Sequence, residues 1–138
     1  MIAVDQDKTT IHLTRGDSTG SEYNKLALNC TYYDATDGQE KEYLFQPSDK
    51  ISFVVFSKKG YTKPEILRKD FLLSEIGYTE PTTSLEIPLS EIDTKKFPLL
   101  NKQATYWYVI TLNDTSTILG HDEDGAKHII VYPEGSEE

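Results

Sequence analysis

Three histidines and one cysteine are the side chains best suited to bind a metal or to act as a nucleophile. The histidines are His12, His121 and His128, and none has a second histidine at a spacing that makes a convincing metal site. Cys30 is the only cysteine, which excludes an intramolecular disulfide and a cysteine-rich zinc site. We interpret Cys30 as a small buried apolar residue, and we expect no metal site.

An acidic turn, 121–125, is the richest local source of oxygen ligands. It lacks the oxygen ladder and the bidentate acid of a calcium loop, so we interpret it as a solvated hairpin turn. The sequence has no serine in a nucleophile elbow and no glycine-rich phosphate loop. We therefore expect no enzyme activity, no catalytic residue and no cofactor. A pocket in which two acids meet His121 or His128 would reopen the enzyme hypothesis.

Three short motifs match recognition or modification patterns but have local structural explanations. Arg15-Gly16-Asp17 is a tripeptide read by some adhesion receptors, and it also has the composition of a strand end and turn. Asn29-Cys30-Thr31 and Asn113-Asp114-Thr115 fit the glycosylation pattern. The start of the chain lacks the basic flank and apolar core of a signal peptide, so we interpret both as structural.

The charge of the chain restricts its partners. The formal net charge is -9, with 14 basic and 23 acidic residues. Nucleic acids and acidic membrane surfaces both require clustered lysine and arginine, so we expect neither as a partner. No apolar run is long enough to cross a bilayer. The chain is thus expected to work where it is made or to leave the cell inside a larger particle.

The segment 105–112 is the element around which we expect the fold to be built. At a period of two residues, Tyr106, Tyr108, Ile110 and Leu112 share one face, and Trp107 falls on the other. All its residue types favour a strand and none is charged. Large side chains on both faces are typical of a central strand, with the Tyr106 face in the core.

The remaining elements are predicted to be short strands separated by turns. The alternation is clearest at 10–15, 23–33, 50–57, 65–73, 84–89, 105–112 and 127–132, with shorter strands at 43–45 and 117–119. This predicts an all-β fold, a sandwich or a barrel of about seven to eight strands, with neighbours along the chain pairing as antiparallel hairpins.

Local signals mark two breaks between these strands and one interruption within the strand 65–73. Asp37-Gly38 is a strong hairpin turn signal. The segment 90–97 is the one predicted helical turn, which Ser90 caps and Pro98 ends. The charged run 68–70 interrupts the apolar pattern of its strand, as a bulge or as an edge kept charged against aggregation.

The chain has nine tyrosines, five phenylalanines and one tryptophan, and most of them are expected to fill the core. Tyr23, Tyr61 and Tyr78 lie near predicted loops instead. Exposed aromatic side chains can stack on sugars or bury in partner proteins. We therefore predict these three tyrosines as interface residues.

Several sequence motifs, taken in order along the chain, resemble those of small immunoglobulin-like domains of tailed phages and prophages, including the N-terminal domain of baseplate upper proteins. The opening strand and Thr-Arg-Gly-Asp correspond to 11–18, and the next motif is PSDKISFVV at 47–55. A charged strand with a lysine follows at 66–71, then IPLSEIDT at 87–94 and the Tyr-rich strand at 106–112. The resemblance covers about residues 10 to 132.

This resemblance implies an immunoglobulin-like antiparallel β-sandwich. The length predicts one domain, 1–138, with its core at about 10–132 and an acidic tail at 133–138. The implied role is a non-catalytic structural or assembly module of a phage or prophage virion, in the tail, baseplate or neck. Its partners would be other virion proteins or copies of itself, in the virion or in the bacterial cytoplasm during assembly. The alternative is a carbohydrate- or receptor-binding β-sandwich.

Overall fold

The chain is all-β in a computed structural model that describes residues 1–4, 10–20, 24–29, 31–58, 62–99, 101–114, 116–119, 121–122, 125–126 and 128–133. In these ranges the strands are β1 (Ile2–Val4), β2 (Ile11–Thr14), β3 (Ala27–Asn29), β4 (Thr31–Asp34), β5 (Gln39–Glu42), β6 (Lys50–Lys58), β7 (Thr62–Leu72), β8 (Ser84–Glu86), β9 (Ala104–Leu112), β10 (Ser116–Leu119), β11 (His121–Asp122), β12 (Gly125–Ala126) and β13 (His128–Tyr132). A 3-10 turn, η1 (Leu73–Ile76), and a short helix, α1 (Glu91–Thr94), complete them.

Six strands form a continuous sheet in the order β1-β2-β13-β9-β6-β7. β10 extends this sheet by pairing with the later part of β9, whereas β13 pairs with its earlier part. Neighbours in this sheet are antiparallel except β2 and β13, which run parallel. In the described ranges, β3 with β8, β4 with β5, and β11 with β12 form separate two-stranded sheets.

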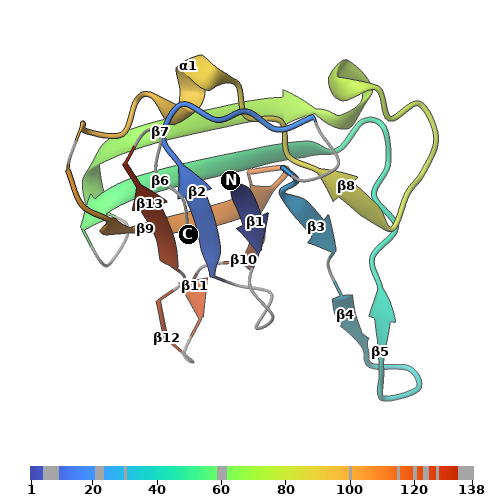
Figure 1. Cartoon of the computed structure of the whole chain (residues 1–138). Helices are drawn as coiled ribbons and strands as arrows, with labels where there is room; N and C mark the ends of the chain where they lie inside the picture. The colour runs from blue at the N-terminus through green and yellow to red at the C-terminus, as the bar shows by residue number, and fades with distance from the viewer. Residues whose placement is uncertain are drawn as a thin grey trace.

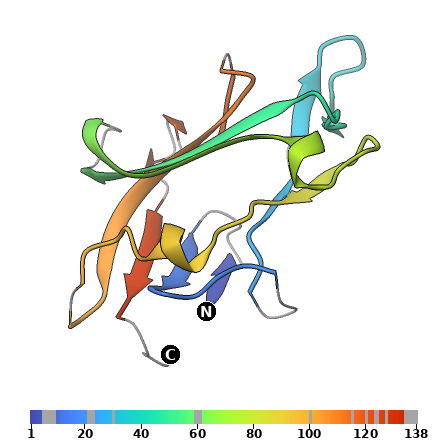
Figure 2. The same cartoon turned by 90° about the horizontal axis from the view of Figure 1, so that it is seen from above.

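The long sheet curves around the core. Figure 2 shows β6 and β7 on one side, β13, β2 and β1 on the other, and β9 passing from one to the other. The buried cluster draws side chains from both sides and from the segments between them. It includes Ile2, Ile11, Leu13, Leu28, Phe45, Ile51, Phe53, Val55, Leu67, Leu85, Ile87, Phe97, Tyr106, Tyr108, Ile110, Leu112, Ile129 and Val131.

The predicted central strand is confirmed as β9. Its core face carries Tyr106, Tyr108, Ile110 and Leu112, and each of these side chains is buried. The ring of Tyr108 packs against that of Phe53 in β6, with centroids 5.7 Å apart. Burial of one large apolar side chain stabilises a fold by about 1.5–3 kcal/mol. The four buried side chains of β9 therefore supply a large share of the stabilisation that comes from the core.

Two segments far apart in the sequence close the core beside the curved sheet. The backbone N–H of Thr19 donates to the carbonyl of Leu89 at 2.9 Å, and the N–H of Leu89 donates to the Thr19 hydroxyl at 2.9 Å. The buried Thr94 hydroxyl donates to the Asp17 carbonyl at 2.8 Å and accepts from the N–H of Gly16 at 3.0 Å. The turn after β2 is therefore fixed to α1.

The helical turn predicted at 90–97 is confirmed as α1, with Ser90 as its N-cap, but the helix ends at Thr94, before Pro98. The Ser90 hydroxyl accepts from the N–H of Asp93 at 3.1 Å, and the Asp93 carboxylate accepts from the N–H of Ser90 at 2.9 Å. This is a reciprocal capping box. The same carboxylate lies 2.9 Å from the ammonium of Lys69 in β7, which attaches α1 to the sheet.

The hairpin at Asp37-Gly38 is also confirmed. It joins β4 to β5, and Gly38 has a φ of 71°, which favours glycine. The charged run 68–70 lies inside a continuous β7, which is an edge strand. Of the two register shifts in this pair, the one nearer to the run falls two positions before it, at Ile66, so the charges are those of a protected edge.

The predicted pairing of consecutive strands is correct for some hairpins. It is wrong for the pairs that join distant parts of the chain. β2 pairs in parallel with the last strand, β13, and β3 pairs with β8. Sheet partners are chosen by burial of side chains from distant parts of the chain, and local turn signals carry no such information. The segment 23–33 is likewise not one strand, because β3 pairs with β8 and β4 pairs with β5.

Two other sequence predictions are corrected by the structure. Residues 43–45 form only a single bridge, from Phe45 to Thr82, because the second strand of the hairpin lies at β5. β1 was not expected, yet its Ile2 is fully buried, so the core begins before residue 10. Cys30 and the tail residues 134–138 lie outside the described residues.

Acid stability tests the link between α1 and β7. Burial alone would raise the pKa of Asp93, but hydrogen bonds from Ser90 and Lys69 outweigh it and hold that pKa below its ordinary 3.8. A carboxylate with a depressed folded pKa stabilises the fold above its unfolded pKa and loses that effect as pH falls through the folded pKa. We expect wild-type stability to fall below pH 3.8, and Asp93→Asn to be less stable at neutral pH with a shallower acid decline.

Urea unfolding at a series of pH values measures both quantities. Asp70→Asn is the matched control, since Asp70 is exposed and pairs at the surface with Arg68 at 3.3 Å. Its acid decline should match that of the wild type. An unchanged acid decline in Asp93→Asn would contradict this account of the helix cap.

Candidate functional site

Only one of the three predicted interface tyrosines is among the described residues. Tyr78 is partly buried against the core, and its hydroxyl accepts from the N–H of Glu86 at 2.8 Å. It thus secures the end of β8. Tyr23 and Tyr61 lie outside the described residues, so their predicted role as interface residues stays a prediction.

The described histidines contact aromatic side chains. His12 Nδ1 is hydrogen-bonded to the Tyr132 hydroxyl at 2.8 Å, and the two rings stack with centroids 5.9 Å apart. His128 lies beside Trp107, with ring centroids 6.0 Å apart. The side chain of His121, in the acidic turn, is not described. In the ranges that the structure describes, no three or more metal-ligating side chains gather around a common point.

The face of the long sheet opposite the core is the strongest candidate site, and we call it the outer face. Its members follow from the register, because residues paired across neighbouring strands point the same way. Val54 in β6 lies opposite Arg68 in β7 and Val109 in β9. Trp107 lies opposite Phe56 on one side and His128 on the other. The outer face therefore combines apolar and aromatic side chains from β6, β9 and β13 with a charged side chain from β7.

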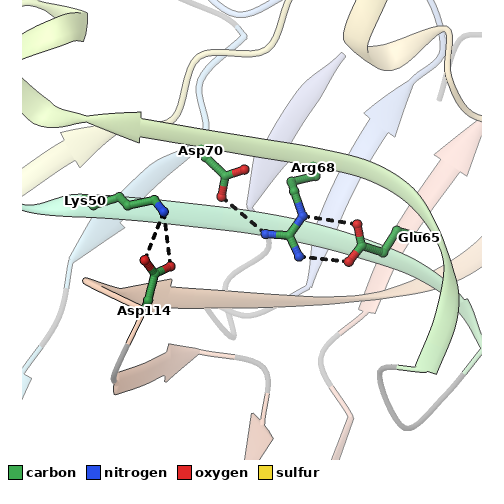
Figure 3. Close-up of polar contacts among 5 residues, drawn as sticks. All are labelled: Lys50, Glu65, Arg68, Asp70 and Asp114. Atoms are coloured by element: carbon green, nitrogen blue, oxygen red, sulfur yellow. Dashed lines mark hydrogen bonds and ion pairs between the residues drawn. The ribbon is translucent and has the colours of Figure 1, made fainter.

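A clamped arginine lies over one side of the outer face. Two nitrogens of Arg68 donate to the Glu65 carboxylate at 2.8 and 3.1 Å, and a third donates to Asp70 at 3.3 Å. Figure 3 shows the guanidinium held between these two acids above β6. The contact with Glu65 raises the pKa of Arg68 above its ordinary value. Val54 is buried although it faces away from the core, consistent with cover from this paired side chain.

A second ion pair lies at the far end of β6. The ammonium of Lys50 contacts both oxygens of Asp114, at 2.9 and 3.3 Å (Figure 3). Asp114 follows Asn113 in a tight turn with left-handed φ values of 60° and 54°, which asparagine and aspartate tolerate better than most residues. The charges around the outer face are thus largely neutralised within the chain.

The outer face also contains two polar atoms without a partner. The Ser52 hydroxyl and the Trp107 Nε1 are both buried, and neither has a hydrogen-bond partner. Leaving a buried polar group unpaired costs about 1–3 kcal/mol, and such groups in native proteins usually have a reason. Among the described residues, the core-facing side chains of β6 and β9 include no such unpaired polar atom.

The arrangement suits recognition better than catalysis. Trp107, Val109 and Ile130 are only half-buried and lie near charges that are already paired. Protein interfaces use such a pattern, with aromatic and aliphatic side chains at the centre and polar groups at the rim. The alternation of residues 105–112 places Trp107 away from the core, but it does not predict the contacts of Arg68 with Glu65 and Asp70. The three-residue spacing of Glu65 and Arg68 shares a face only because of the register shift at Ile66.

The comparisons with known proteins leave the family open. No family model matches the chain, and no curated protein or solved structure matches it either. Among the described residues, no helix has both the length and the apolar character needed to cross a membrane.

The unpaired Ser52 hydroxyl gives a direct test of the outer face. We expect Ser52→Ala to leave the free energy of unfolding unchanged or to raise it by about 1 kcal/mol, because the variant removes a buried group that has no partner. Thr94→Val is the matched control, since it deletes a buried hydroxyl with good partners and should cost about 1–3 kcal/mol. Urea unfolding measures both. A loss in Ser52→Ala equal to that in Thr94→Val would show that the serine is paired.

Proposed function

We propose that this chain is a non-catalytic assembly module of a phage or prophage virion. In this proposal it is an immunoglobulin-like β-sandwich in a tail, baseplate or neck, and it acts through protein–protein contacts. It would reside in the virion, and in the bacterial cytoplasm during assembly. The single observation that carries the proposal is the outer face, whose half-exposed aromatic and apolar side chains lie among charges that are already paired.

The strand order supports the immunoglobulin-like part of the proposal. In variable-type immunoglobulin domains, strands G, F, C and C′ are neighbours in one sheet, and strands B and E belong to the other. Here β13, β9, β6 and β7 are neighbours in that order, and β3 pairs with β8. These strands also occur along the chain in the required sequence. The sandwich would then comprise this sheet and the smaller one opposite.

The chemistry of the outer face supports a protein partner. Trp107 is the residue type most enriched at energetic centres of interfaces, and it lies next to Val109 and His128. The ordered resemblance to phage immunoglobulin-like domains points to virion proteins as that partner. Fold alone does not choose a function, so the partner class rests on that resemblance.

A carbohydrate- or receptor-binding module is the second candidate. The observation in its favour is the partly exposed indole of Trp107 beside the imidazole of His128, with ring centroids 6.0 Å apart. Aromatic faces of this kind stack on sugar rings. Quenching of the tryptophan fluorescence by added glycans, without binding to any virion protein, would favour this candidate.

Sedimentation velocity with the tail, baseplate and neck proteins encoded beside this gene tests the proposal. We expect the chain to co-sediment with at least one of them, and Val109→Lys to weaken that complex at least tenfold, because it buries a charge at the centre of the contact. Thr79→Lys is the matched control, since Thr79 is exposed and lies outside the outer face. It should bind as the wild type does.

Two results would overturn the proposal. One is a chain that binds none of these proteins. The other is a Val109→Lys variant that is folded by circular dichroism and binds as well as Thr79→Lys.

A further inference from the structure

The β4–β5 hairpin projects from the rest of the molecule, and we call it the arm (residues 31–42). In Figures 1 and 2 it extends away from the curved sheet. In the described part of the chain, β4 and β5 pair only with each other. Every residue of β5 is exposed to solvent. Two-stranded hairpins are marginally stable in water, so an arm of this kind needs support from its own side chains or from a partner.

Ion pairs within the arm supply that support. The ammonium of Lys41 lies 2.7 Å from the Asp34 carboxylate and 2.9 Å from that of Asp37. Asp34 also accepts from the N–H and the hydroxyl of Thr36, at 2.9 and 2.6 Å. The bond from Lys41, followed by those from Thr36, lowers the pKa of Asp34. The arm is therefore preorganised, which reduces the entropy that docking would cost.

One side of the arm has charges that no lysine neutralises. Glu40 and Glu42 alternate with Lys41, so they point away from the ion pairs. Neither has an ion-pair partner among the described residues. Leu44 continues the alternation, because Tyr43 and Phe45 pack against each other on the core side, and it is 48% exposed. This side of the arm presents two free carboxylates followed by an exposed leucine.

The opposite end of the molecule has the complementary character, and we call it the end patch. It consists of Lys96, Pro98, Leu99 and Lys102, between α1 and β9. Leu99 is 72% exposed, and neither lysine has an ion-pair partner in the described ranges. Pro98 and Lys102 line a shallow surface hollow whose interior space is about 10 Å³, roughly that of one water molecule. The end patch is therefore a contact surface and not a ligand pocket.

We propose that the end patch binds the arm of a second copy of this chain. Glu40 and Glu42 of one copy would meet Lys96 and Lys102 of the next, and Leu44 would pack against Leu99. The chain carries a net charge of -9, so a second copy brings an excess of acidic groups to this basic surface. Among the described residues, the arm combines unpaired carboxylates with an exposed leucine, which complements the lysines and Leu99 of the end patch. This inference rests on the proposed assembly function and names the partner.

The positions of the two surfaces fix the kind of assembly. The arm and the loop that carries Leu99 lie at opposite ends of the molecule in both Figures 1 and 2. The contact is therefore head-to-tail, with different surfaces on the two copies. Contacts of this class close into rings or continue as filaments. A closed ring suits a particle with rotational symmetry.

Paired charge reversals test the contact by sedimentation velocity. The arm variant is Glu40→Lys with Glu42→Lys, and the patch variant is Lys96→Glu with Lys102→Glu. We expect the wild type to associate at protein concentrations up to about 1 mM, the weak end of specific binding. Each double variant alone should weaken that association at least tenfold. An equimolar mixture of the two should restore it, because each acidic surface again meets a basic one.

Controls separate this inference from the proposed function. Glu80→Lys with Glu86→Lys reverses two exposed charges elsewhere and should associate as the wild type does. Val109→Lys, on the outer face, should also leave self-association unchanged. Circular dichroism verifies that every variant is folded.

Three outcomes would overturn the inference. They are a wild type that stays monomeric, a mixture that does not recover association, and a loss of association in Val109→Lys. A monomeric wild type that still binds a virion protein would refute the arm contact alone and leave the proposed function standing.

Discussion

The strand β9 is hydrogen-bonded along both of its edges, to β6 on one side and to β13 and β10 on the other. Through these ladders it connects the two sides of the curved sheet. Its buried face, from Tyr106 to Leu112, packs against both sides at once. The parallel pair of β2 and β13 depends on β9 because β13 reaches β6 only through it. The rest of the fold is arranged around this one doubly paired strand.

The same constraint decides which surfaces are left for contact with other molecules. Since one face of β9 and β6 is used by the core, the opposite face must carry Trp107, Val109 and their neighbours outward. The free edge of β7 is a poor docking site, because exposed charged side chains such as Arg68 and Asp70 oppose pairing with another strand. Contacts are thus left to the outer face and to the two ends of the molecule. Such separate surfaces would allow the proposed assembly module to contact several neighbours.

Local signals in the sequence were enough to predict several elements but not their partners. The alternation in β9, the Ser90 cap and the Asp37-Gly38 turn each depend on adjacent residues, and each was confirmed. The pairing of β3 with β8 depends on Leu28 meeting Leu85, across more than fifty positions of the chain. β1 has only three residues and no turn signal of its own. The Arg68 clamp was missed because a register shift at Ile66, invisible in the alternation, brings Glu65 onto its face.

Native-state hydrogen exchange of the backbone amides tests the central role of β9 most directly. Amides that open only on global unfolding exchange most slowly, and those in projecting hairpins open locally. The account predicts that Tyr108, Val109 and Ile110 are among the slowest to exchange, with the free energy of global unfolding, while the β4–β5 arm exchanges far faster. Exchange of the β9 amides by local opening, at the rate of the arm, would contradict it.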